Sequence, residues 1–151
     1  MLRDSINDRL KEAMKAKDER RVSTLRMVNA AIKNADIEAR TGKGPLTDED
    51  LLGLLQKMIK QRQESVELYD KGGRPELAAQ EREEIAIIQA FLPEQISDLE
   101  VKAAIGDIIE ELGATSVKDM GKVMAALKAA YAGRMDFAKA SSLVKELLTG
   151  K

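Results

Sequence analysis

Pro93 is the residue that most restricts how this chain can fold. A proline inside a helix removes a backbone hydrogen-bond donor and clashes with the preceding turn. A few residues later, Ser97 and Glu100 have the spacing of a capping box, the reciprocal hydrogen-bond motif that starts a helix. One helix must therefore end before the proline, and another must begin after Ser97. These signals predict a boundary between two domains, residues 1–92 and residues 94–151.

Apolar residues recur every three or four positions along most of the chain, which is the period of an amphipathic helix. No stretch shows the strict alternation of a β-strand. The predicted fold class is all-α, with an N-terminal bundle of about four helices, one of them long, followed by a small three-helix C-terminal domain. The predicted N-terminal helices are 2–17, one that begins after Asp18, 48–71 and 75–90. The longest spans on the order of 36 Å at about 1.5 Å per residue.

Cap and turn residues predict the ends of the three C-terminal helices. Gly113 should end the first helix and Gly133 the second, because glycine readily adopts the left-handed conformation found after a helix. Ser116 with Asp119 should cap the second helix, and Asp136 the third. The apolar residues expected to pack inward are Val101, Ala104, Ile105, Ile108, Leu112, Met120, Val123, Met124, Leu127, Tyr131, Phe137, Ala140, Val144, Leu147 and Leu148.

The chain contains no cysteine and no histidine. Disulfides, Cys or His metal ligands, and nucleophile systems built on either residue are therefore excluded. We expect no cofactor and no metal. Charged residues stand where a secretory signal needs an apolar run, and no apolar stretch reaches the roughly 18 residues of a membrane span. This pattern predicts a cytoplasmic protein with no membrane partner.

Glu81 and Glu84 raise the question of catalysis, since paired carboxylates can act as general acid and base. The sequence shows no partner base, metal-ligand set or apolar pocket to accompany them. We therefore expect these carboxylates to pair with Arg82 or Arg74 on helix surfaces. No catalytic residue is predicted.

Charge is distributed unevenly along a chain whose net charge is close to zero. Residues 1–63 carry 14 basic and 10 acidic side chains, residues 64–111 carry 4 and 13, and residues 112–151 carry 7 and 3. Two basic ends therefore flank an acidic middle. This asymmetry permits an anionic partner at either end.

Three cations, Arg26, Lys33 and Arg40, stand seven positions apart and should line one face of the second helix. Such a face can follow the phosphates of a nucleic acid, or it can be an ordinary solvated surface. The middle of the long helix, residues 56–63, is rich in amides and cations and admits the same two interpretations.

A strip of small residues, Gly121, Ala125 and Ala132, is predicted on the second C-terminal helix. A glycine inside a helix costs about 1 kcal/mol relative to alanine, so Gly121 needs a reason. Either another helix packs closely against it, or the backbone of an RNA approaches it. The sequence leaves both explanations open.

Several segments, occurring in the same order over essentially the full length, resemble the YqeY family. The C-terminal part of that pattern is also similar to the tail of the GatB subunit of tRNA-dependent amidotransferases. The segments that carry the resemblance are Ala13–Asp18, Leu25–Asn34, Gly73–Ala78 with Glu81, Glu84 and Ile85, Phe91–Ser97, Gly121–Met124, Gly133–Arg134 with Asp136, and Val144–Leu148.

The resemblance implies a non-catalytic module that binds tRNA, or one that docks on an aminoacyl-tRNA synthetase or amidotransferase without direct RNA contact. Carbon–nitrogen ligase activity is implied only as part of a larger complex, because amidase and kinase segments are not found in this sequence. DNA binding is not expected. Few aromatics are present to stack on bases, so phosphate contacts should dominate. The candidate RNA-binding residues are Lys118, Gly121, Lys122, Lys128, Gly133, Arg134 and Lys139, together with Arg26, Lys33 and Arg40.

Overall fold

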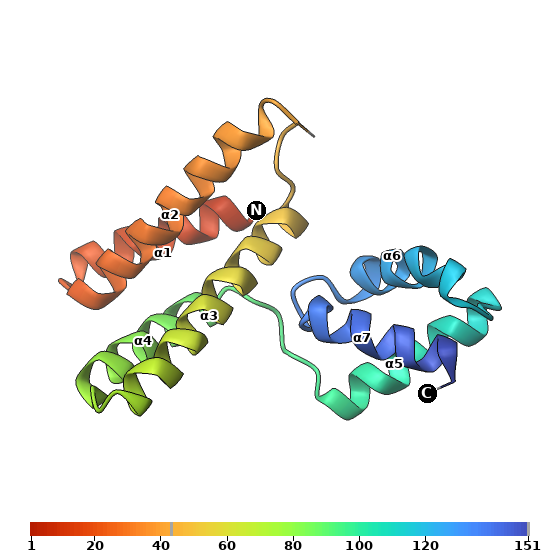
Figure 1. The fold of residues 1–151 in the computed structure, drawn as a ribbon. Helices are drawn as coiled ribbons and strands as arrows, with labels where there is room; N and C mark the ends of the chain where they lie inside the picture. The colour runs from red at the N-terminus through yellow and green to blue at the C-terminus, as the bar shows by residue number, and fades with distance from the viewer. Residues whose placement is uncertain (43, 151) are drawn as a thin grey trace. The chain divides into compact units, whose positions relative to one another are not determined.

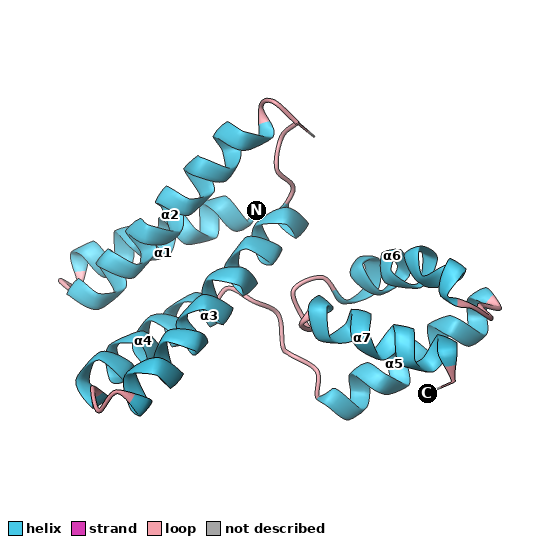
Figure 2. Cartoon of the chain, in the orientation of Figure 1, coloured by secondary structure: helices cyan, strands magenta, loops and turns pink. Residues whose placement is uncertain are grey.

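The fold is shown in Figures 1 and 2 as a computed structural model that describes residues 1–42 and 44–150. These residues form seven α-helices and one short 3-10 helix and contain no strand, so the all-α prediction is confirmed. Helix contacts divide the chain into an N-terminal unit, Met1–Leu92, and a C-terminal unit, Pro93–Lys151. Residues 43 and 151, which fall within the two predicted domains, lie outside the described residues.

The N-terminal unit is built around a hairpin of two helices. Its helices are α1 (Leu2–Lys15), α2 (Glu19–Ala39), α3 (Asp48–Lys71) and α4 (Pro75–Gln89). α3 and α4 lie side by side, α1 packs on α2, and α2 also packs on α4 (Figure 1). The hairpin turn contains Gly73 at φ +70°, and Pro75 occupies the first position of α4. Both residues suit these positions, because glycine tolerates positive φ and proline needs no N–H partner there.

Side-chain caps determine where α2 and α3 begin. The Thr47 hydroxyl accepts a hydrogen bond from the Asp50 N–H at 3.2 Å, and the Asp50 carboxylate accepts one from the Thr47 N–H at 3.0 Å. The Asp18 carboxylate accepts the Arg21 N–H at 3.2 Å. Each such cap contributes about 1 kcal/mol. The buried core of this unit consists of Ile6, Ala13, Leu25, Val28, Ile32, Leu51, Leu55, Met58, Ile59 and Ile88.

The C-terminal unit is a three-helix group with a short 3-10 turn. Its elements are α5 (Asp98–Leu112), η1 (Val117–Asp119), α6 (Met120–Tyr131) and α7 (Phe137–Thr149). The predicted capping box of Ser97 and Glu100 starts α5, and the Asp136 carboxylate caps α7. Gly113 ends α5 at φ +63°. The buried core comprises Val101, Ile105, Val123, Leu127, Met135, Ala140 and Val144.

Three local predictions for this unit are wrong. The Ser116 side chain does not cap a helix, because the chain enters α6 through η1, and Asp119 instead accepts the Thr115 N–H at 3.0 Å. Leu112 and Leu147, expected to point inward, are 48% and 41% exposed. Both lie in the last turn of their helices, where the described part of the neighbouring helices does not cover them.

Candidate nucleic-acid interface

α2 presents a basic face to solvent. Arg26, Lys33 and Arg40 are all exposed, and their spacing places them along one side of the helix. Ile37 lies on the same side, between Lys33 and Arg40, and is 50% exposed. Within the described residues, none of the three cations forms an ion pair. Their charge is therefore available to an anionic partner.

Asp36 is an acidic side chain close to Arg40 on this part of α2. Arg3 donates two hydrogen bonds to its carboxylate, at 2.9 and 2.6 Å. This pairing holds the pKa of Asp36 below its usual range, and Arg40 adds a smaller attraction. Because Arg3 already occupies both carboxylate oxygens, Asp36 leaves Arg40 open to other partners.

α6 exposes lysines and small residues on its solvent side, where Lys122 and Lys128, six residues apart, lie roughly 120° apart around the helix. Lys122 and Lys128 are exposed, as are Gly121 and Ala125. A Cβ atom built on Gly121 would meet nothing within 4 Å, so a close contact with another helix of this chain does not explain the glycine. That interpretation is wrong for Gly121, which faces solvent together with Ala125, whereas Ala132 is half-buried and lies beyond the last residue of α6. Close approach of an external backbone stays a prediction.

Gly133 and Arg134 have a role within the C-terminal unit that the sequence did not reveal. The buried Gly133 has φ +75°, and its carbonyl accepts a hydrogen bond from the Gln95 side chain. The Arg134 guanidinium donates to the Glu94 carbonyl at 3.0 Å and lies 5.6 Å from the centre of the Tyr131 ring. These contacts fix the segment that leads into α5 against the turn between α6 and α7.

The candidate cations of the C-terminal unit do not form one cluster. Lys118 lies in η1, one turn before Lys122 in α6. Arg134 and Lys139 follow the other end of α6, which has 12 residues. At about 1.5 Å per residue, roughly 14 Å of helix separates Lys122 from the end of α6 at Tyr131. The candidate cations are therefore spread over η1, α6, the turn after α6 and α7.

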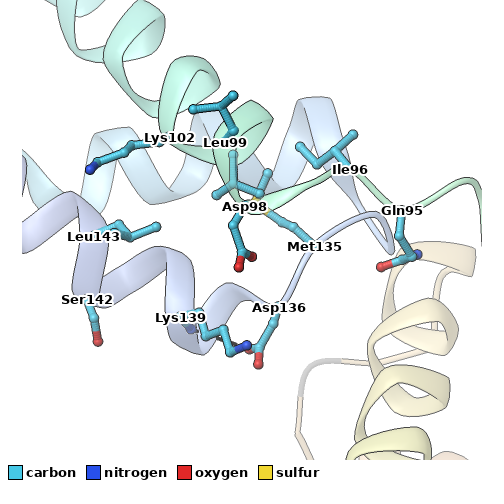
Figure 3. A pocket seen from close by; sticks show the side chains of 11 residues that line it. Gln95, Ile96, Asp98, Leu99, Lys102, Met135, Asp136, Lys139, Ser142 and Leu143 are labelled. Atoms are coloured by element: carbon cyan, nitrogen blue, oxygen red, sulfur yellow. Dashed lines mark hydrogen bonds between the residues drawn. The ribbon is translucent and has the colours of Figure 1, made fainter.

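Lys139 borders a pocket of about 680 Å³ between α5 and α7 (Figure 3). Leu99 and Lys102 line this pocket from α5, and Lys139 and Leu143 line it from α7. Sequence reasoning found Lys139 but missed Lys102 and Leu99. Leu99 could have indicated this pocket, because it is an apolar residue in the first turn of α5 that does not belong to the residues predicted to pack inward.

A largely buried ion pair lies in the N-terminal unit. The Arg62 guanidinium donates to the Glu84 carboxylate at 3.3 Å, and the two side chains are 13% and 6% exposed. Arg62 also donates to the Met58 carbonyl at 3.2 Å. The predicted partners of Glu84 are therefore wrong, because α3 packs along α4 and brings Arg62 to it.

The other two arginines proposed as partners are occupied by different acids. Arg82 pairs with Asp70 at 2.6 Å, and Arg74 pairs with Glu76 at 3.4 Å. Burial and the neighbouring Glu84 carboxylate raise the pKa of Glu81 above its ordinary value. No group of three or more carboxylates that could hold a metal ion occurs in the part of the chain described by the structure.

Replacing Gly121 with Ala should stabilise the C-terminal unit by about 0.5 kcal/mol, because the site is helical, exposed and free of neighbours. Gly106 in α5 is equally open and provides a matched control. Urea unfolding of both alanine variants measures this gain. If Gly121 marks a close approach of RNA, only Gly121→Ala should also weaken RNA binding. A loss of stability in Gly121→Ala would contradict the observed open environment.

The fold and its surfaces define an all-helical protein of two units with exposed basic helix faces. The chain belongs to the YqeY-like family, since the family described as "Yqey-like protein" matches residues 3–148. No helix among residues 1–42 and 44–150 is long and apolar enough to cross a membrane.

Several fungal proteins named "Altered inheritance of mitochondria protein 41, mitochondrial" are similar to this chain. The protein from Vanderwaltozyma polyspora is 35% identical over 118 residues, which is 74% of this chain and 62% of that protein. The proteins from Lachancea thermotolerans and Eremothecium gossypii are 38% identical over 105 residues and 39% over 83 residues. These alignments cover 68% and 55% of this chain, and 55% and 44% of the two relatives. The matches thus span about half of the relatives' length, and the mitochondrial location in their names refers to those proteins.

Proposed function

We propose that this protein is a tRNA-binding accessory module that has no catalytic activity by itself. The observation that carries the proposal is the pair of exposed basic helix faces, Arg26, Lys33 and Arg40 on α2 and Lys122 with Lys128 on α6. No ion pair within the described residues neutralises these cations. Phosphate groups are the complementary partners for cations arranged along helix faces.

The pairing of other arginines supports this interpretation. Arg3, Arg20 and Arg82 are also at least partly exposed, yet each forms an ion pair with a carboxylate at 3.0 Å or less. These three arginines are thus paired with neighbouring carboxylates, whereas the cations of the proposed faces form no ion pair within the described residues. The similarity of the C-terminal part to the GatB tail favours tRNA as the polyanion. A cytoplasmic location remains a prediction for this chain.

Affinity for total tRNA should fall about tenfold or more between about 50 mM and about 200 mM salt, because even two or three neutralised phosphates release their counterions. Fluorescence anisotropy with labelled tRNA at both salt concentrations measures the change. A helical protein of similar size and charge serves as the control for non-specific attraction. Binding that equals the control, or that does not respond to salt, would reject the proposal.

A further inference from the structure

A small pocket in the N-terminal unit is lined by two arginines and, among the described residues, by no carboxylate. It has a volume of about 210 Å³ and is formed by α1, α2 and the C-terminal end of α4. Arg9 lines it from α1 and Arg21 from α2. The other lining residues are Leu25, Ile87, Ala90 and Phe91. Two cations therefore share a hollow whose remaining lining is apolar.

Neither guanidinium of this pocket has a partner in the part of the chain that the structure describes. Most other arginines of the same unit do pair with a carboxylate, namely Arg3, Arg20, Arg62, Arg74 and Arg82. The acids closest in sequence to the pocket arginines do not neutralise them. Asp18, one turn before Arg21, accepts the Arg21 backbone N–H at 3.2 Å, and Glu12, three residues after Arg9, is exposed and forms no ion pair with it.

Partial burial makes the unpaired charge of Arg21 costly. Its side chain is half-buried, and Leu25, one turn further along α2, is fully buried. A cation that has lost part of its water needs a counter-charge to recover the lost solvation energy. The apolar lining also lowers the local dielectric constant, which strengthens the attraction between the guanidinium groups and an anion. The pocket is therefore arranged to favour a small anion.

We propose that Arg9 and Arg21 bind a phosphate monoester in this pocket. A guanidinium group presents paired N–H donors that match the oxygens of a phosphate. Two guanidinium charges also match the charge of about −2 on a monoester better than the single charge of an internal phosphodiester. The volume of about 210 Å³ equals that of about seven water molecules in the liquid, which is enough for a phosphate group and a small part of the molecule that carries it.

The phosphate monoester has two possible sources with the same chemistry, the end of an RNA chain and a small phosphorylated molecule. The site uses none of the cations assigned above to tRNA binding, so it does not rest on that proposal. Loss of tRNA binding in variants of α2 or α6 would leave the pocket proposal standing, and the reverse also holds.

Titration of the full-length protein with methyl phosphate, a monoester, and dimethyl phosphate, a diester, tests the proposal through amide shifts in NMR spectra. Methyl phosphate should shift the amides of Arg9, Arg21 and Ala90 and bind several-fold more tightly than dimethyl phosphate. Arg9→Gln with Arg21→Gln should weaken methyl phosphate binding by about tenfold or more, because charge-assisted hydrogen bonds are lost. Equal binding of the two probes, or shifts confined to other parts of the protein, would overturn the proposal.

The matched control is Lys11→Gln with Lys15→Gln, which removes two charges from exposed positions of α1 outside the pocket. Affinity for methyl phosphate should stay within about twofold of the original in this variant, because distant surface charges are screened. Arg9→Gln alone guards against misfolding, since Arg9 is exposed, and it should weaken binding several-fold. Equal losses in the two double variants, or unchanged affinity in Arg9→Gln, would contradict a site built on the two guanidinium groups.

A pair of RNA oligonucleotides of one sequence, with and without a 5′-phosphate, identifies the source of the monoester. Tighter binding of the phosphorylated oligonucleotide, lost in Arg9→Gln with Arg21→Gln, would support the end of an RNA chain. Equal binding of both oligonucleotides, together with Arg9-dependent binding of methyl phosphate, would support a small phosphorylated molecule. If no monoester shows binding that depends on Arg9 and Arg21, the proposal is wrong.

Discussion

Replacing Glu84 with Ala should lower the free energy of unfolding of the N-terminal unit by about 3 kcal/mol. The substitution leaves the Arg62 guanidinium, with only 13% of its side chain exposed, without its acidic partner. Removing one member of a buried ion pair costs more than the pair contributed, because the remaining charge stays desolvated. Glu84→Ala also removes apolar side-chain contacts between α3 and α4, which acts in the same direction.

Tyrosine fluorescence during urea unfolding can isolate this effect. The chain has two tyrosines and no tryptophan, Tyr69 in α3 and Tyr131 in α6. In a Tyr131→Phe background, Tyr69 reports on the N-terminal unit alone. Glu83→Ala is the matched control, because Glu83 pairs with Arg20 at the surface and is 61% exposed. That control should change the unfolding free energy by about 0.5 kcal/mol or less.

A double replacement distinguishes a desolvated charge from simple loss of packing. Arg62→Met combined with Glu84→Leu keeps the volume and removes both charges, so it should recover most of the stability lost in Glu84→Ala. If the double variant is no more stable than Glu84→Ala, the loss arises from packing. Equal effects of Glu84→Ala and Glu83→Ala would show that the Arg62–Glu84 pair is solvated in solution.

The helix ends could be predicted from the sequence because local chemistry determines them. Ser97 and Glu100, predicted as a capping box, lie three residues apart and form that box at the start of α5. Their hydrogen bonds depend on the local backbone and on no distant part of the chain. The cap predicted at Ser116 failed because a 3-10 turn was inserted before α6, a choice that depends on how α6 packs.

Contacts between helices could not be predicted in the same way. Arg62 and Glu84 are 22 residues apart, and only the packing of α3 on α4 joins them. A signal existed, since Arg62 continues the apolar stripe of Met58 and Val66 at helical spacing and so should have been expected to be buried. The amides and cations of residues 56–63 instead indicate a surface, which hides the pair from sequence-based prediction.

The candidate RNA-binding residues also differ in this respect, because helix spacing determines the position of some of them and contacts with distant residues determine the role of others. Helical spacing correctly placed Arg26, Lys33 and Arg40 on one exposed face of α2. The hydrogen bond from Arg134 to the Glu94 carbonyl spans 40 residues, and spacing gives no sign of it. Arg134 is consequently a poor choice for a binding test, because its substitution would also disturb the segment leading into α5.

Charge reversal on α6 gives a cleaner test of the proposed function. Lys122→Glu with Lys128→Glu should weaken tRNA binding on the order of tenfold at about 150 mM salt, because two phosphate contacts are lost. The slope of log K against log salt concentration should become shallower by about 2. Both side chains are exposed and form no ion pair within the described residues, so folding should be preserved.

The matched control is Lys71→Glu with Lys145→Glu, two exposed lysines outside the proposed faces that give the same change in net charge. If general electrostatic attraction alone holds the RNA, both double variants should lose the same affinity and the same salt slope. A specific interface predicts a loss only for the α6 variant. The corresponding reversal on α2, Arg26→Glu with Lys33→Glu, then determines whether the N-terminal unit contacts the same RNA. Additive losses in the combined variant would mean that the two units bind independent phosphates, since substitutions at distant sites add when no partner is shared.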